Sequence, residues 1–245
     1  MLEVIYGFLV IMYIYFLYRQ GNQALCLKNF VISYMLFNVG LVIFVLESIS
    51  IMRFLFIWNL FLAIIPLICM MVFEHLLKTQ PNRIYLGLVG ILWLLFFPNA
   101  IYVVTDLIHL QNSEFYDFIP SVNYSPAETI YFPHINDWII LIDAVILFVL
   151  GTYAGLLSLD KMLMYIKKFA AKWLSLISLP VISLLTAIGI YIGRFLRFNS
   201  WDIFHPFQLV NNFVTSIDVF GVEFIALFTF YTFCSYLFYK LIKRT

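Results

Sequence analysis

Long apolar runs recur along the chain and are separated by short segments that carry most of its charges. Each run has the length of an α-helix that crosses a hydrocarbon core of about 30 Å, which needs about 20 residues. The runs do not alternate apolar with polar residues, as transmembrane β-strands do. The pattern predicts an all-α, polytopic transmembrane helical bundle with seven spans, at residues 3–18, 29–47, 53–73, 84–105, 138–158, 174–195 and 218–239.

The composition leads to the same class of protein. Hydrophobic residues make up 64% of the 245 residues and charged residues 11%, which exceeds what a soluble domain of this size needs. Because no long soluble segment interrupts the runs, we expect one integral-membrane domain over residues 1–245, with the lipid bilayer as its partner. The net charge of +1 predicts no nucleic-acid partner. Two glycine pairs, Gly151/Gly155 and Gly189/Gly193, predict close helix packing.

The positions of Lys and Arg set the expected orientation, because these residues gather in cytoplasmic loops. Of the 14 basic residues, all but Arg53, Arg194 and Arg197 fall on one side of the predicted bundle. We therefore expect a multi-pass protein of the plasma membrane with its N-terminus outside and its C-terminus inside. The short connection at residues 47–53 leaves a re-entrant pair as the alternative for spans two and three.

Two connections are expected to have a character of their own. The long outer loop, residues 106–137, has no Lys or Arg and is rich in acidic and aromatic residues, which is typical of a lid or binding element at the membrane interface. In the inner segment, residues 160–173, apolar residues form one helical stripe: Met162, Ile166, Phe169 and Trp173. Lysines occupy much of the remainder. This segment is either an amphipathic helix on the inner leaflet or a solvated loop with snorkelling lysines.

One stretch, residues 96–110, departs from the apolar pattern near the outer end of the fourth span. Pro98 removes a helix hydrogen bond and predicts a kink. Four polar residues follow at helical spacings: Asn99, Tyr102, Asp106 and His109. In a continuing α-helix they would share an arc of about 80°, which must face other helices or a wet cavity. The alternative is structural, with Asn99 capping the broken helix and Asp106 and His109 marking the membrane interface.

Three histidines expected on the outer side each have a carboxylate three residues away. The pairs are Asp106 with His109, His134 with Asp137, and Asp202 with His205. Neighbouring imidazole and carboxylate groups suit either a general base held by an orienting acid or the ligands of a divalent metal. No HExxH motif favours the metal. The candidates for catalysis or metal ligation are Asp106, His109, His134 and His205.

Charged residues also fall inside the predicted spans. Asp143 lies in span five and Glu223 in span seven, where a charge is costly and indicates function by default. Arg194 and Arg197 lie at the outer end of span six, and the guanidinium fork suits carboxylates and phosphates. Either Arg194 forms a buried ion pair with Asp143 or Glu223, or the arginines hold an anionic part of a substrate.

Three segments carry a family resemblance: FFPNAIYVVTDLIHL at residues 96–110, DWIILIDA at residues 137–144 and GRFLRFNSWD at residues 193–202. Over roughly residues 85–215 the chain resembles the bacterial integral-membrane proteins of domain-of-unknown-function family 1361. The resemblance implies a multi-pass plasma-membrane protein and no established activity. These candidate residues lie in the family's motif segments: Pro98, Asn99, Asp106, His109, Arg194, Arg197, Asn199 and Asp202.

The sequence leaves three functions open. The first is a hydrolase or transferase that acts on a lipid-linked or envelope substrate at the outer face. Its substrate-binding residues would be Asn99, Tyr102, Arg194, Arg197, Asn199 and Asp202. The second is an ion- or proton-coupled transporter in which Asp143 and Glu223 are the coupling groups. The third is a membrane scaffold or sensor whose acidic, aromatic outer loop binds a partner.

Overall fold

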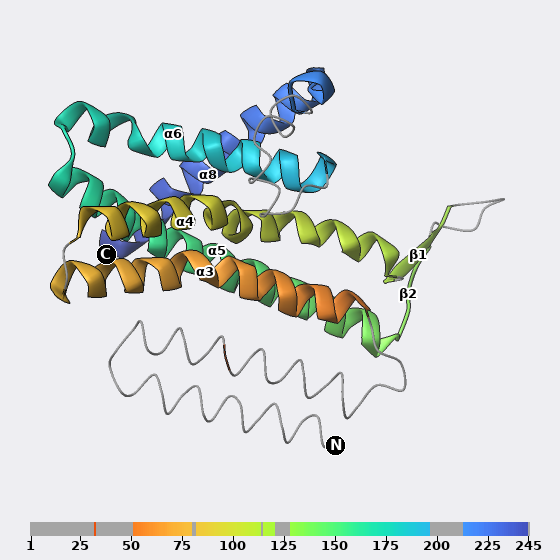
Figure 1. Ribbon diagram of the computed structural model, residues 1–245. Helices are drawn as coiled ribbons and strands as arrows, with labels where there is room; N and C mark the ends of the chain where they lie inside the picture. The colour runs from red at the N-terminus through yellow and green to blue at the C-terminus, as the bar shows by residue number, and fades with distance from the viewer. Residues whose placement is uncertain are drawn as a thin grey trace. The chain divides into compact units, whose positions relative to one another are not determined.

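The computed structural model of the protein describes residues 32, 51–79, 82–113, 115–120, 128–196 and 213–244. Most of these residues are helical (Figure 1). The elements in chain order are α3 (Ile51–Thr79), α4 (Arg83–Tyr102), the 3₁₀ helix η1 (Val103–Asn112), β1 (Tyr116–Ile119), β2 (Glu128–Tyr131), α5 (Ile135–Phe169), α6 (Lys172–Tyr191), the π-helix η2 (Ile192–Leu196) and α8 (Val219–Arg244).

Within the described residues, five helical stretches are long and apolar enough to cross a membrane. They are Phe54–Thr79, Arg83–Gln111, Asp137–Phe169, Lys172–Leu196 and Val219–Lys243. They correspond to the last five predicted spans, so the expectation of an all-α membrane bundle is confirmed. The predicted spans at 3–18 and 29–47 lie outside the described residues. The 29 residues of α3 give a helix of about 44 Å, which is long enough for a full span.

The described residues separate into two compact units. The first holds the described parts of Met1–Asn59 and Thr105–Leu150, and the second holds those of Leu60–Val104 and Gly151–Thr245. All three boundaries fall inside helices, so α3, η1 and α5 each contribute to both units. The single domain expected over residues 1–245 stays a prediction.

The core of the second unit forms around α4, and α6 contacts both α4 and α8 (Figure 1). Trp93, Phe97 and Ile101 recur every four residues on one face of α4, and each is at most 2% exposed. The rings of Trp93 and Phe97 stack with their centroids 4.8 Å apart. The indole Nε1 donates a hydrogen bond to Ser158 Oγ at 3.1 Å, so this buried polar group is satisfied inside the protein.

Three of the four glycines expected in close helix packing have a close neighbour: Gly151, Gly155 and Gly189. A Cβ at Gly155 would lie 2.6 Å from the Ala100 Cβ, and one at Gly189 would lie 2.8 Å from Cγ of Pro98. A Cβ at Gly193 would meet no atom of the described residues within 4 Å. Only glycine lets α5 and α6 approach α4 this closely.

The winding of the fourth span changes after Tyr102, where α4 ends and η1 begins. In a 3₁₀ helix, residues three apart are eclipsed, so Asp106 and His109 share a face with the buried Val103. From Tyr102 to Asp106 the chain turns about 120° beyond a full turn, instead of about 40° in an α-helix. The predicted single arc, which began at Asn99, is therefore wrong, because it assumed α-helical winding throughout.

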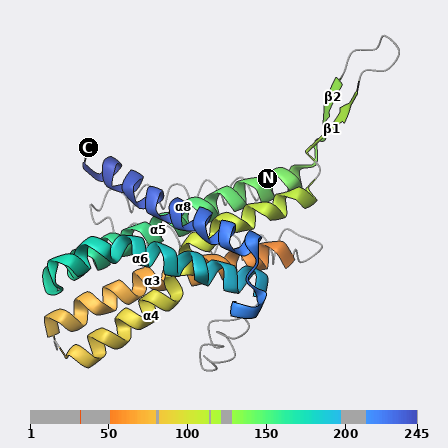
Figure 2. The same ribbon diagram turned by 90° about the horizontal axis from the view of Figure 1, so that it is seen from above.

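The outer loop expected at residues 106–137 contains the end of η1, a β-hairpin and the start of α5. Strands β1 and β2 pair antiparallel, with Tyr116 opposite Tyr131 and Ile119 opposite Glu128 (Figure 2). All eight strand residues are exposed. Aromatic and β-branched residues favour strands, and the rings of Tyr116 and Tyr131 lie 6.1 Å apart across the pair.

The inner segment expected at residues 160–173 is not a separate element. Its residues up to Phe169 continue α5, and α6 begins at Lys172. No proline or glycine occurs between Leu156 and Phe169, and the Leu, Met, Lys and Tyr side chains there are compatible with an uninterrupted helix. The position of this segment relative to a leaflet stays a prediction.

Replacing Gly155 by Ala is expected to destabilise the protein by about 1–3 kcal/mol, because the added methyl meets the Ala100 methyl and neither can rotate away. The measurement is the free energy of unfolding in mixed micelles. Gly90→Ala is the matched control, since a Cβ there meets no described atom within 4 Å. The substitution raises the helix propensity by the same amount as Gly155→Ala. The pair Gly155→Ala with Ala100→Gly should regain stability. Equal stability of the Gly155 and Gly90 variants would contradict the close contact.

Candidate functional site

Asp106 is the central polar group of the first unit. The 3₁₀ winding of η1 turns its side chain inward, and the residue is 1% exposed. Asn59 of α3 donates from Nδ2 to Oδ2 of Asp106 at 2.7 Å. A carboxylate in a membrane span is costly, and a hydrogen bond to an ionised acceptor is stronger than a neutral one. Asn59 therefore helps to hold Asp106 and fixes one of its oxygens.

The sequence analysis missed Asn59, although a signal was present. Between Arg53 and Glu74 it is the only residue with an amide, hydroxyl or charged side chain. An isolated amide in an otherwise apolar span must find a partner inside the protein, because lipid offers none. That reasoning predicts an inward-facing Asn59, although it does not name Asp106 as the partner.

His109 lies one turn of η1 after Asp106, on the same face, and is half-buried. An imidazole that is neither fully buried nor fully exposed can meet a reactant and still be oriented by the protein. His134 lies between β2 and α5, where it is exposed, and its ring centroid is 6.0 Å from that of Phe132. Of these two described histidines, only His109 has the partial burial that suits an oriented base.

The two charged residues expected inside the spans differ in burial. Asp143 is 3% exposed and lies on the face of α5 that also buries Leu147 and Leu150. Glu223 is exposed on α8, whose buried face passes through Ile225 instead. The burial of Asp143 agrees with a role inside the first unit. Glu223 lies off the packed face of its helix, and its role as a coupling group or ion-pair partner stays a prediction.

Arg194 and Tyr102 meet in the second unit. Arg194 lies in the π-helix η2, and its Nη1 donates to the Tyr102 hydroxyl at 2.9 Å. Its Cζ lies 5.6 Å from the centroid of the Tyr102 ring, within the range of a cation–π contact. π-helical turns are frequent at functional sites. The tyrosine therefore fixes one edge of the guanidinium and faces its charge.

Asn99 has a local partner. Its Nδ2 donates to the Phe96 carbonyl oxygen at 3.1 Å, within the same helix. The helix α4 continues through Pro98 to Tyr102, as the expected resumption of the helix requires. This bond agrees with the structural interpretation of Asn99 as a residue that satisfies the backbone near the proline.

The remaining predicted site residues lie outside the described residues: Arg197, Asn199, Asp202 and His205. Among the residues that the structure does describe, no group of three or more His, Cys, Asp or Glu side chains could hold a metal ion. The predicted meeting of His109, His134 and His205 at one metal or catalytic centre therefore stays a prediction.

Five apolar helices of membrane-spanning length, with buried polar groups between them, define a multi-pass helical membrane protein. Residues 58–235 match the family described as Protein of unknown function (DUF1361). The chain belongs to this family, as its motif segments predicted. Comparisons with curated proteins and with solved structures give no match.

The bond from Asn59 to Asp106 is expected to stabilise the protein measurably. Asn59→Leu keeps a similar volume but removes the donor, so the loss should be about 1.5–3 kcal/mol in the free energy of unfolding. Asp106→Leu alone should also destabilise. The double variant should lose clearly less stability than the two single variants together. It contains no carboxylate at position 106, so no buried carboxylate is left without the Asn59 donor. Strict additivity in mixed-micelle unfolding would show that the two side chains do not interact.

Proposed function

We propose that this chain is an enzyme of the plasma membrane, a hydrolase or transferase that acts on a lipid-linked or envelope substrate at the outer face. The observation that supports this proposal is the pairing of a buried carboxylate with a more accessible histidine. Asp106 is 1% exposed and held by Asn59 at 2.7 Å, and the half-buried His109 follows one 3₁₀ turn later.

In this proposal His109 is the general base and Asp106 its orienting acid. His109 would take a proton from the attacking water or hydroxyl group and return it to the leaving group. A fixed carboxylate beside the ring would stabilise the imidazolium formed between the two steps. Proton transfer of this kind typically contributes 10²–10⁴-fold to the rate. His134 and His205 stay candidates for further roles in the same reaction.

The proposed binding group for the anionic part of the substrate is Arg194, with Arg197 as a second candidate. The Tyr102 hydroxyl already fixes the Arg194 guanidinium at 2.9 Å, so less rotational freedom is lost when an anion binds. A guanidinium presents five N–H donors, of which Tyr102 accepts one. Asn99, Asn199 and Asp202 complete the proposed set of substrate-binding residues.

The test of this proposal uses the purified protein in lipid nanodiscs, with polyprenyl diphosphate and phosphatidylglycerol as probes and mass spectrometry of the products. His109→Gln should lower turnover by about 10²–10⁴-fold, and Asp106→Asn should lower it in the same direction. His75→Gln is the matched control, because His75 is exposed on α3, sixteen residues or about 24 Å along the helix from Asn59. Turnover that is undiminished in His109→Gln, or absent for both probes in the wild-type protein, counts against the proposal.

The second candidate is an ion- or proton-coupled transporter, and the burial of Asp143 favours it. A carboxylate that is 3% exposed inside a membrane-spanning helix, eight residues after the start of α5, is a typical feature of an ion path. In this function Asp143 carries the coupled proton or ion. Glu223, the other predicted coupling group, is exposed and is less suited to that role.

If the protein is such a transporter, Asp143→Asn should abolish pH-driven proton uptake into proteoliposomes, because the amide cannot bind and release the proton. Glu223→Gln serves as the matched control, since it removes a carboxylate from an exposed position. The measurement is the fluorescence of an internal pH dye. Wild-type vesicles that take up no more protons than empty vesicles, or an Asp143→Asn protein with full uptake, would rule this function out.

A further inference from the structure

A cavity of about 490 Å³ lies where the end of α5, the start of α6 and the end of α8 come together. Its α5 wall begins at Asp160, which follows Ile135 by 25 residues, or about 38 Å along the helix. The hydrocarbon core is only about 30 Å thick. The cavity therefore falls at the membrane surface, at the opposite end of α5 from the hairpin connection.

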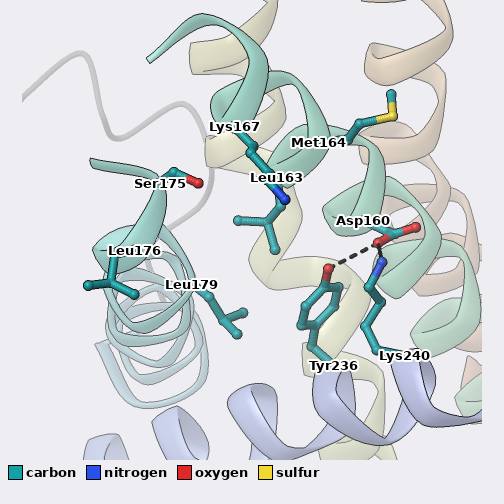
Figure 3. A pocket seen from close by; sticks show the side chains of 9 residues that line it. All are labelled: Asp160, Leu163, Met164, Lys167, Ser175, Leu176, Leu179, Tyr236 and Lys240. Carbon is teal, nitrogen blue, oxygen red and sulfur yellow. Dashed lines mark hydrogen bonds and ion pairs between the residues drawn. The ribbon is translucent and has the colours of Figure 1, made fainter. Parts of the chain in front are cut away.

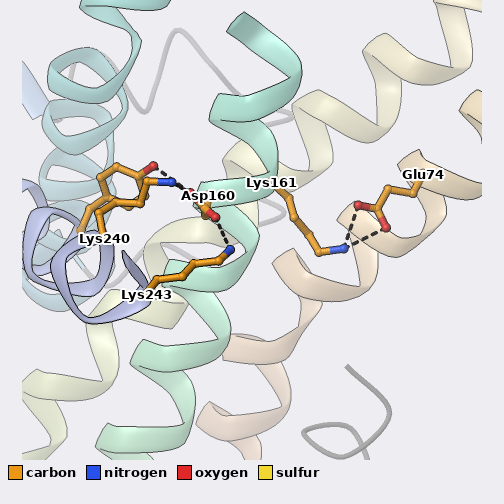
Figure 4. Close-up of polar contacts among 6 residues, drawn as sticks. Glu74, Asp160, Lys161, Lys240 and Lys243 are labelled. Atoms are coloured by element: carbon orange, nitrogen blue, oxygen red, sulfur yellow. Dashed lines mark hydrogen bonds and ion pairs between the residues drawn. The ribbon is translucent and has the colours of Figure 1, made fainter. Parts of the chain in front are cut away.

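The polar wall of the cavity has an excess of positive charge. Asp160 accepts hydrogen bonds from Nζ of Lys240 and of Lys243, each at 2.7 Å (Figure 4). It also accepts one from the Tyr236 hydroxyl at 3.0 Å (Figure 3). Two ammonium groups thus share one carboxylate, and Lys167 in the wall adds a further positive charge. An ammonium has three N–H donors, of which Lys240 gives one to Asp160.

The neighbouring ion pair does not change this balance. Lys161 donates to both carboxylate oxygens of Glu74, at 2.7 and 2.8 Å (Figure 4). Each of these charges is neutralised by the other. The surplus of positive charge that Lys167, Lys240 and Lys243 give over Asp160 therefore remains beside the cavity, and it favours an anion there.

The other wall of the cavity is apolar. Leu163 of α5 and Leu176 and Leu179 of α6 border it, as Figure 3 shows beside Lys167. A small anion such as phosphate would use only the basic part of this space. A ligand that contacts both walls has an anionic group joined to an alkyl chain. The volume is within the range of about 300–1,000 Å³ that is typical of small-molecule sites.

We propose that this cavity binds an anionic phospholipid. The phosphate would lie between Lys167 and Lys240, and the first part of an acyl chain would lie against Leu163 and Leu179. The site is independent of the proposed outer-face activity, since it uses none of the same residues. Anionic lipids are abundant in the cytoplasmic leaflet, which is the side where this end of the helices is expected from the distribution of Lys and Arg.

The test is native mass spectrometry of the full-length protein in detergent, titrated with phosphatidylglycerol or with phosphatidylcholine of the same acyl chains. Phosphatidylglycerol should bind more tightly, and Lys167→Gln should raise its Kd about tenfold, the loss expected for one charge-assisted hydrogen bond. Lys168→Gln is the matched control. This neighbour is also exposed, and its ammonium lies 5.2 Å from the Phe169 ring centroid instead of in the cavity wall.

Three outcomes would overturn the proposal. The first is equal binding of phosphatidylcholine and phosphatidylglycerol, since the anionic group would then be irrelevant. The second is an equal effect of Lys167→Gln and Lys168→Gln, since binding would then not involve the cavity. The third is displacement of phosphatidylglycerol by equimolar inorganic phosphate with the same dependence on Lys167, which would identify free phosphate as the ligand.

Discussion

The close packing of α5 and α6 on one stretch of α4 is the contact on which the rest of the described structure depends. Inside a bilayer, apolar side chains gain little by leaving lipid, so helices associate through tight van der Waals contact. The stretch Pro98–Val103 receives three such contacts, from Gly151, Gly155 and Gly189. Because Val103 at the end of this stretch is the first residue of η1, the contact from Gly151 also holds the start of that helix.

Polar side chains then determine which faces of the helices meet. Trp93 bonds to Ser158, Tyr102 to Arg194 and Asn59 to Asp106, each across two helices far apart in the sequence. In hydrocarbon the alternative to such a bond is an unsatisfied group, which costs several kcal/mol. Each hydrogen-bonded pair therefore favours one rotation of its two helices about their axes, whereas the surrounding apolar residues could pack in several rotations.

The sequence predicted the helices well because the bilayer determines their length. Five apolar runs became five helices, and Gly151, Gly155 and Gly189 have the predicted role. The 3₁₀ winding of η1 was not predictable, because it differs from an α-helix by only about 20° per residue and no residue type marks it. The hairpin was missed because two strands of four residues are too short for a periodic signal.

For the candidate site, the sequence supplied the candidate residues, and their meeting at one centre stays a prediction. Asp143, which was predicted inside span five, is buried, and Asp106 is buried too, although the predicted fourth span ended at residue 105. Glu223 is also a carboxylate inside a predicted span, but it lies off the packed face of α8. The position of a residue along a span does not show which side of the helix it is on. The partner of Asp106 lies 47 positions away, so only tertiary packing could identify it.

The change of winding at Val103 also changes which groups can act together. In an α-helix Tyr102 and Asp106 would point in nearly the same direction, whereas in η1 their directions differ by about 120°. Asp106 and His109 instead lie one above the other, about 6 Å apart along the axis. Burying a carboxylate costs free energy, which the protein must offset with other interactions. A carboxylate one 3₁₀ turn from a histidine can orient the imidazole ring. The proposed chemistry therefore depends on this pair, which the 3₁₀ winding aligns on one face of η1.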